Sequence, residues 1–245
     1  GVLAEKFGDF GVLGHRVCIA LLQVFAILSI YKSPALRSES QRILASVASV
    51  TVILVFMPDI FGHMYKYQTI VGILLVVILS QYTVPAILCP ENLSPLRVIS
   101  GNFLIASLPF LAITYLPVAG LLFLASFRGE YFKNIATGCS LGLIANLFFL
   151  GVYGSFSGFL AFHLYLNAKV LPFYAGLQPG GELIVNALRV ATSDLTHFLS
   201  LIGILLSALI LAQKEEKFPW RTLLLVAGLL SLLMRGAGFH GLPYF

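Results

Sequence analysis

Two uninterrupted apolar runs decide the fold class: IVGILLVVIL at residues 70–79 and LSLIGILLSALIL at residues 199–211. Neither run alternates apolar and polar residues, as the strands of a membrane β-barrel do. A transmembrane helix needs about 20 mostly apolar residues, and each run lies inside an apolar segment of about that length. The runs therefore predict membrane-spanning helices and an all-α fold.

The composition of the whole chain agrees with a membrane protein. Its 245 residues are 59% hydrophobic and only 10% charged, with a mean hydropathy of +0.96, whereas soluble domains carry about 25% charged residues. These values exclude a water-soluble enzyme and a disordered chain. The 15 Lys and Arg outnumber the 10 Asp and Glu, but they stand singly between apolar runs and form no stripe that binds nucleic acid. We therefore expect an integral membrane protein, surrounded by membrane lipids, with no nucleic-acid partner.

The apolar pattern predicts a single transmembrane domain over residues 1–245, with about seven or eight membrane helices. The expected spans are residues 11–31, 43–57, 69–89, 98–127 (two shorter helices that bend near 115–117), 135–153, 195–213 and 220–234. Pro85 is expected to kink the last turn of its span. Residues 154–194 differ, because 156–169 and 182–192 have amphipathic helical spacing but too little apolar length to cross. These two pieces are predicted to lie in the outer membrane interface.

The basic residues predict the orientation. Nine of them fall in four short connections on one side, against six over much more chain on the other side. Short loops rich in Lys and Arg stay in the cytoplasm, so we expect these four connections to be cytoplasmic and the amphipathic pieces to face outward. The expected location of this multi-pass protein is the bacterial inner membrane. The nine are Lys32, Arg37, Arg42, Arg97, Arg128, Lys133, Lys214, Lys217 and Arg221.

Under this topology all five histidines fall on the outer side: His15, His63, His163, His197 and His240. The ordinary explanation, that polar residues gather at helix ends, stays open for each. No two histidines have the spacing of a metal motif, and none has a carboxylate at ligand spacing. We therefore assign no cofactor, and a divalent metal stays possible without support from the sequence. The three cysteines, Cys18, Cys89 and Cys139, are interpreted as small buried hydrophobic residues.

Two arginines lie at the outer edges of apolar spans: Arg16 just inside the first, and Arg235 just past the last. Arginine at a membrane edge often extends its charged group toward water, and this alone could explain both positions. With His15 and His240 beside them, the two could instead clamp a phosphate, because guanidinium groups bind phosphate bidentately. Both explanations stay open. Glu182 and Arg189 are interpreted as solvated charges.

Several short motifs follow one another along the chain. They are FGD at residues 7–9 leading to His15-Arg16, the segment from ISG at 99–101 to LPVAG at 116–120, ATG at 136–138, GSFSGF at 154–159 leading to Asn167, and Arg235 through FH at 239–240 to LPYF at 242–245. In order and spacing the chain resembles the GT-C superfamily. This superfamily contains integral-membrane glycosyltransferases that use polyprenyl-phosphate sugars, such as mannosyl- and aminoarabinosyl-transferases.

The resemblance implies transfer of a sugar from a polyprenyl-phosphate donor to an acceptor at the outer membrane face. Arg235 and His240 match the late outer motif of the family, and His15 and Arg16 match the early one, so these four are expected to bind the donor phosphate. The family's catalytic carboxylate lies in the first outer loop, which is expected upstream of Gly1. No catalytic residue is therefore assigned, and Asp59 is a candidate by location alone.

Two other functions remain open at this point. The chain could be a non-catalytic GT-C-like subunit of a larger membrane complex with protein partners, as the missing acid suggests. It could also be a transporter, because its spans are broken by proline, although its halves show no obvious internal repeat. The sequence names neither the sugar nor the acceptor.

Overall fold

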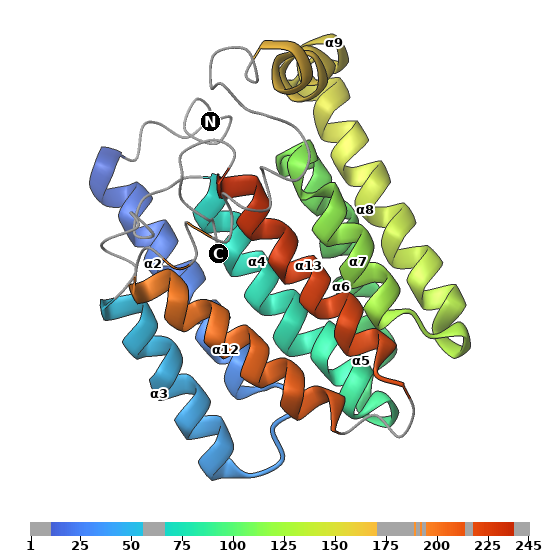
Figure 1. Ribbon diagram of the computed structural model, residues 1–245. Coiled ribbons are helices and arrows are strands. Elements are labelled where there is room, and N and C mark those ends of the chain that lie inside the picture. Colours follow the sequence, from blue (N-terminus) through green and yellow to red (C-terminus); the bar gives the residue numbers. More distant parts are fainter. Residues whose placement is uncertain are drawn as a thin grey trace.

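A computed structural model describes residues 11–55, 67–170, 189, 192, 195–213 and 218–237. Every regular element in these residues is helical (Figure 1), which confirms the all-α prediction. Three described helical segments are long and apolar enough to cross a membrane: Gly11–Tyr31, Thr69–Leu88 and Gly129–Tyr153. The other apolar stretches within described helices have 10–17 residues, so the number of seven or eight spans stays a prediction.

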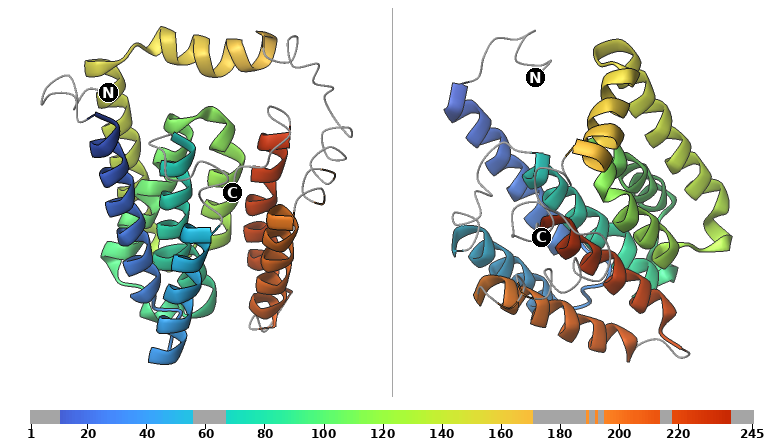
Figure 2. Two further views of the ribbon diagram at one scale, coloured as in Figure 1. Left: turned by 90° about the vertical axis from the view of Figure 1, so that its left-hand side faces the viewer. Right: turned by 45° about the horizontal axis from the view of Figure 1, so that its top comes forward.

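The helices form a bundle with two distinct ends. In chain order they are α2 (Gly11–Tyr31), α3 (Glu39–Val55), α4 (Tyr67–Ile78), π-helical η1 (Leu79–Thr83), α5 (Val84–Leu88), η2 (Pro90–Asn92), α6 (Pro95–Leu111), η3 (Ile113–Tyr115), α7 (Leu116–Ser126), η4 (Gly129–Tyr131), α8 (Phe132–Tyr153), α9 (Phe156–Leu160), π-helical η5 (Ala161–Val170), α12 (Leu195–Ala212) and α13 (Trp220–Ala237). The α2–α3, α5–α6 and α7–α8 connections lie together at one end, which we call the loop end (Figure 1). The α9 helix and η5 lie across the opposite end, the α9 end (Figure 2).

The α3 helix begins four residues before the apolar pattern predicts, at Glu39 instead of residue 43. Ser38 and Gln41 form a capping box: the Gln41 backbone N–H donates to Ser38 Oγ at 3.2 Å, and the Ser38 N–H donates to Gln41 Oε1 at 3.3 Å. This reciprocal pair satisfies two amides that a helix start leaves open. The first turn is polar, so apolar periodicity alone missed it.

At Pro85, where a kink was predicted, the structure has a π-helical turn just before the proline. The turn comprises Leu79–Thr83, and the Val84 N–H donates to the Leu79 carbonyl. Proline lacks the N–H that an α-helix would direct four residues back, and a wider turn accommodates this loss. The Ser80 carbonyl in the turn accepts a hydrogen bond from Ser33 Oγ at 2.5 Å. The π turn therefore connects α4 to the end of α2.

The core lies where η1, α6, α7 and α13 meet, and Tyr82 is at its centre. Tyr82 is 2% exposed and its hydroxyl donates to the Ser126 carbonyl at 3.4 Å. A Cβ at Gly101 would lie 2.4 Å from the Tyr82 ring, so glycine lets α6 approach this side chain. The predicted bend near residues 115–117 is found slightly earlier, because extended Ala112 ends α6. The α6 and α7 helices thus form a hairpin.

The contact between α6 and α8 depends on small residues of α8 spaced one turn apart. A Cβ at Gly138 would lie 2.4 Å from the Ile99 carbonyl oxygen, and one at Gly142 would lie 2.7 Å from that of Phe103. One turn further, Asn146 Nδ2 donates to Ser107 Oγ at 2.9 Å. This small-xxx-small pattern with a polar bond is how helices associate in a membrane. We call this contact the α6–α8 seam.

Replacing Gly142 by alanine should therefore destabilise the protein, because the new methyl group meets backbone that cannot rotate away. Overpacking of this kind costs about 1–3 kcal/mol, and a thermal unfolding curve in detergent would show a lower midpoint. Gly151→Ala is the matched control on the same helix, since no atom lies within 4 Å of a Cβ there. Equal midpoints for the two variants would contradict the tight seam.

Candidate functional site at the α9 end

The predicted interfacial piece 156–169 is helical, as α9 and η5 together. Ser155 begins it, because the Gly158 N–H donates to Ser155 Oγ at 3.1 Å. Phe159 stacks on Phe110, in the last turn of α6, with ring centroids 6.0 Å apart, and η5 contacts η3 at the tip of the α6–α7 hairpin. The hairpin therefore positions this end of the structure. The second predicted piece, 182–192, lies outside the described residues apart from Arg189 and Thr192.

His163 lies among aromatic rings on this helix. Its ring centroid is 4.5 Å from that of Phe159 and 5.0 Å from that of Phe162, the latter edge-on. Partial burial disfavours the imidazolium and lowers the pKa of His163 from its ordinary value of 6.5. The neutral imidazole, which can donate and accept a hydrogen bond at once, is therefore the favoured form of His163 at neutral pH.

The early predicted phosphate ligands lie in the second turn of α2, close to the α9 end (Figure 2). The Arg16 side chain is exposed and His15 is half-buried. Arg235 lies inside the last turn of α13, which continues to Ala237. The helix therefore extends three residues beyond the predicted span, which ended at residue 234. Asp59 and His240 lie outside the described residues, and the same is true of the Arg235 side chain.

The structure brings the beginning of α2 and the end of α13 to the same end of the bundle as α9 (Figures 1 and 2). It does not place them side by side: α2 packs on α3 and α4, whereas α13 packs on α7 and α12. His15 and Arg16 therefore share an end with the Arg235 backbone without sharing a helix contact. A ligand that bound all three would have to extend across the top of α4.

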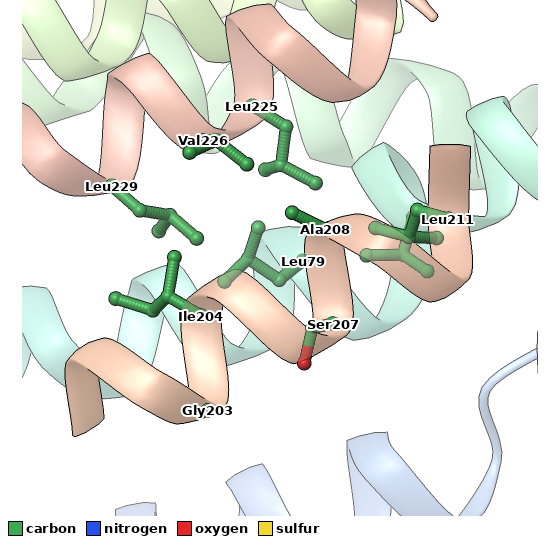
Figure 3. A pocket seen from close by; sticks show the side chains of 10 residues that line it. Leu79, Gly203, Ile204, Ser207, Ala208, Leu211, Leu225, Val226 and Leu229 are labelled. Carbon is green, nitrogen blue, oxygen red and sulfur yellow. The ribbon is translucent and has the colours of Figure 1, made fainter. Parts of the chain in front are cut away.

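Two apolar cavities, both open to the surface, lie away from these residues, and neither was predicted from the sequence. One has a volume of about 350 Å³ and lies between η1, α12 and α13 (Figure 3). The other has a volume of about 280 Å³ and lies between α2, α3 and the α4–η1 helix. Leu79 and Val84 line both. Apolar residues that face lipid, core or a cavity look alike in a sequence, so no signal could have located them.

Metal-binding side chains are sparse in the part of the chain that the structure describes. Within it, no group of three or more His, Cys, Asp or Glu residues could hold a metal ion. Cys89 is buried and Cys139 is half-buried, whereas Cys18 is exposed on α2. The interpretation of Cys18 as a buried residue is therefore wrong, because it lies on the outer face of its helix.

The chain matches no protein-family model, no curated protein and no solved structure. The structure thus defines a class, an all-helical protein with helices suited to a membrane, and the GT-C resemblance remains a hypothesis from the sequence.

The lowered pKa of His163 generates a prediction about acid pH. Its NMR titration midpoint should lie below 6.5, and Phe159→Ala should raise the midpoint toward 6.5 by admitting water. Because the folded pKa is the lower one, the stability from neutral His163 is complete above pH 6.5 and is lost as the pH falls through the folded pKa. Phe149→Ala is the control, since Phe149 pairs with Tyr153 instead. An identical midpoint in all three proteins would contradict the role of burial.

Proposed function

We propose that this chain belongs to a GT-C-like membrane glycosyltransferase that takes its sugar from a polyprenyl-phosphate donor. One observation carries the proposal. Three motifs far apart in the sequence, at His15-Arg16, at residues 154–159 and at Arg235, fall at one end of the bundle. A site for a lipid-linked sugar needs its cations on one side of the membrane, because the phosphate stays at the surface while the lipid tail stays in the hydrocarbon.

The chemistry assigns a role to these cations. The acceptor hydroxyl attacks the anomeric carbon, the bond from that carbon to the phosphate oxygen breaks, and a base removes the hydroxyl proton. Negative charge grows on the departing lipid phosphate, and arginine stabilises it with two parallel hydrogen bonds. Because α2 and α13 do not pack on one another, Arg16 with His15 and Arg235 with His240 are proposed as two separate points of contact with the donor. Asp59 is the candidate base by location alone.

The α9 and η5 helices fit the membrane surface on the donor side. Their exposed side chains include Phe156, Leu160, Phe162 and Tyr165. Aromatic residues are favoured at the boundary between hydrocarbon and water. A polyprenyl phosphate would slide sideways beneath these helices to reach the end of the bundle.

The loop end supports the proposed orientation in a bacterial inner membrane. Three of the four connections that were predicted to be cytoplasmic lie together there (Figure 1). They carry Lys32, Arg37 and Arg128, and Arg97 follows in the first turn of α6. Positive charge in short loops favours the cytoplasmic side. The α9 end would then face outward.

A non-catalytic subunit of a membrane complex is the second candidate, and one observation favours it. The three carboxylates among the described residues all lie at the loop end: Glu39 in the first turn of α3, Glu91 in η2 and Glu130 in η4. The described part of the α9 end therefore offers no carboxylate base. In this alternative the chain binds the lipid-linked sugar for a partner protein.

Binding and transfer of a radiolabelled polyprenyl-phosphate sugar by the purified full chain would separate these hypotheses. We expect Arg16→Ala and Arg235→Ala each to weaken donor binding by roughly tenfold or more, since a charge-assisted hydrogen bond contributes about 1.5–3 kcal/mol. Lys133→Ala, an exposed cation near the loop end, should leave binding unchanged. Binding without transfer would favour the non-catalytic subunit. If none of several donors bound, the proposal would be wrong.

A further inference from the structure

The two apolar cavities are neighbours that are separated by one ridge. Leu79 and Val84 stand at either side of the π turn, joined by the Val84 N–H that donates to the Leu79 carbonyl, and both cavities include these two side chains. On one side of the ridge, Ala208 of α12 and Leu225 of α13 point into the larger cavity (Figure 3). On the other side, the smaller cavity reaches α2 and α3. Together they form a two-part groove, which we call the ridge groove.

The smaller cavity extends to the loop end, because Ser33 and Leu36 of the α2–α3 connection line it. Two guanidinium groups hold this connection by its backbone. Arg42 Nε donates to the Leu36 carbonyl at 3.3 Å, and Arg97 Nη2 donates to the Lys32 carbonyl at 3.4 Å. Two positive charges therefore lie at the connection whose residues line this end of the groove.

The local charge balance is strongly positive. Residues 32–42 contain three basic residues, including exposed Arg37, and one acidic residue, Glu39. The Glu39 carboxylate accepts a hydrogen bond from the Tyr31 hydroxyl. Membrane orientation alone requires cations in this loop, but it does not require guanidinium groups bound to the backbone that borders a cavity. This geometry calls for an additional explanation.

We propose that the ridge groove binds a phospholipid with an anionic headgroup, from the leaflet at the loop end. One acyl chain lies in each cavity, on either side of Leu79 and Val84, and the headgroup phosphate lies beside Arg37, Arg42 and Arg97. Acyl chains suit the cavities because their walls are almost entirely apolar, with Ser207 contributing the hydroxyl drawn in Figure 3. An anionic headgroup is chosen over a neutral one because the surrounding loop carries net positive charge.

This site is separate from the proposed sugar donor site, which lies at the α9 end. Its occupant would fix the angle between the α2–α3 pair and the α12–α13 pair, since each pair borders one cavity. The ridge groove is thus a structural lipid site, and it does not depend on whether the chain transfers a sugar.

Electron spin resonance of spin-labelled lipids tests the proposal on the full chain in phosphatidylcholine vesicles. Spin-labelled phosphatidylglycerol should be immobilised several-fold more than spin-labelled phosphatidylcholine. Arg37→Gln should reduce that preference by about fivefold, the effect of one cation near an anionic headgroup. Lys133→Gln is the charge-matched control on α8 and should retain the preference. Equal immobilisation of the two lipids, or equal losses in the two variants, would overturn the proposal.

A second set of variants tests whether acyl chains occupy the cavities, because charge alone could attract anionic lipid. Ala45→Phe fills the smaller cavity and Ala208→Phe fills the larger one without changing charge, so each should lower immobilisation of phosphatidylglycerol. Ala136→Phe, at an exposed position of α8, is the control of equal size. Circular dichroism in phosphatidylcholine establishes that every variant is folded. Full immobilisation in folded Ala45→Phe and Ala208→Phe would show that no chain enters the groove, and the proposal would be wrong.

Discussion

The close approach of α6 to both of its neighbours is the contact on which the rest of the bundle depends. On one side Gly101 admits the Tyr82 ring, and on the other Gly138 and Gly142 admit the carbonyl oxygens of Ile99 and Phe103. Lipid tails are as apolar as leucine, so helices in a membrane are held together by close packing and by polar bonds between them. Without these glycines α6 would stand too far from both neighbours for either contact.

The position of α6 determines what stands at each end of the molecule. Its last turn carries Phe110, on which α9 docks through Phe159. Its first turn carries Arg97, which holds the α2–α3 connection by the Lys32 carbonyl. The α9 helix and the basic α2–α3 connection therefore both contact α6, at its opposite ends. A tilt of this helix would move both membrane surfaces of the protein together.

The apolar runs were sufficient to predict the fold class and most helices, because burial in lipid requires continuous hydrophobic length. They failed where other forces act: the Ser38–Gln41 capping box extends α3 into a polar segment. For the candidate site, the sequence predicted only which end of the bundle it occupies. That prediction came from the positions of Arg16 and Arg235 at the ends of their apolar spans. The cavities could not be predicted, because they depend on the distances between helices. The apolar spacing within one helix does not determine those distances.

The π turn at Leu79–Thr83 also has a consequence for register along its own helix. A π turn holds one residue more than an α turn, and each residue advances a helix by roughly 100°. The residues of α5 are thereby rotated relative to those of α4, which brings the Ala86 carbonyl to the Arg128 guanidinium, at 2.6 Å from Nη2 and 3.1 Å from Nε. Loss of a single residue from this turn would rotate that carbonyl away from the Arg128 guanidinium. The length of this segment is therefore constrained as well as its buried side chains, Tyr82 and Thr83.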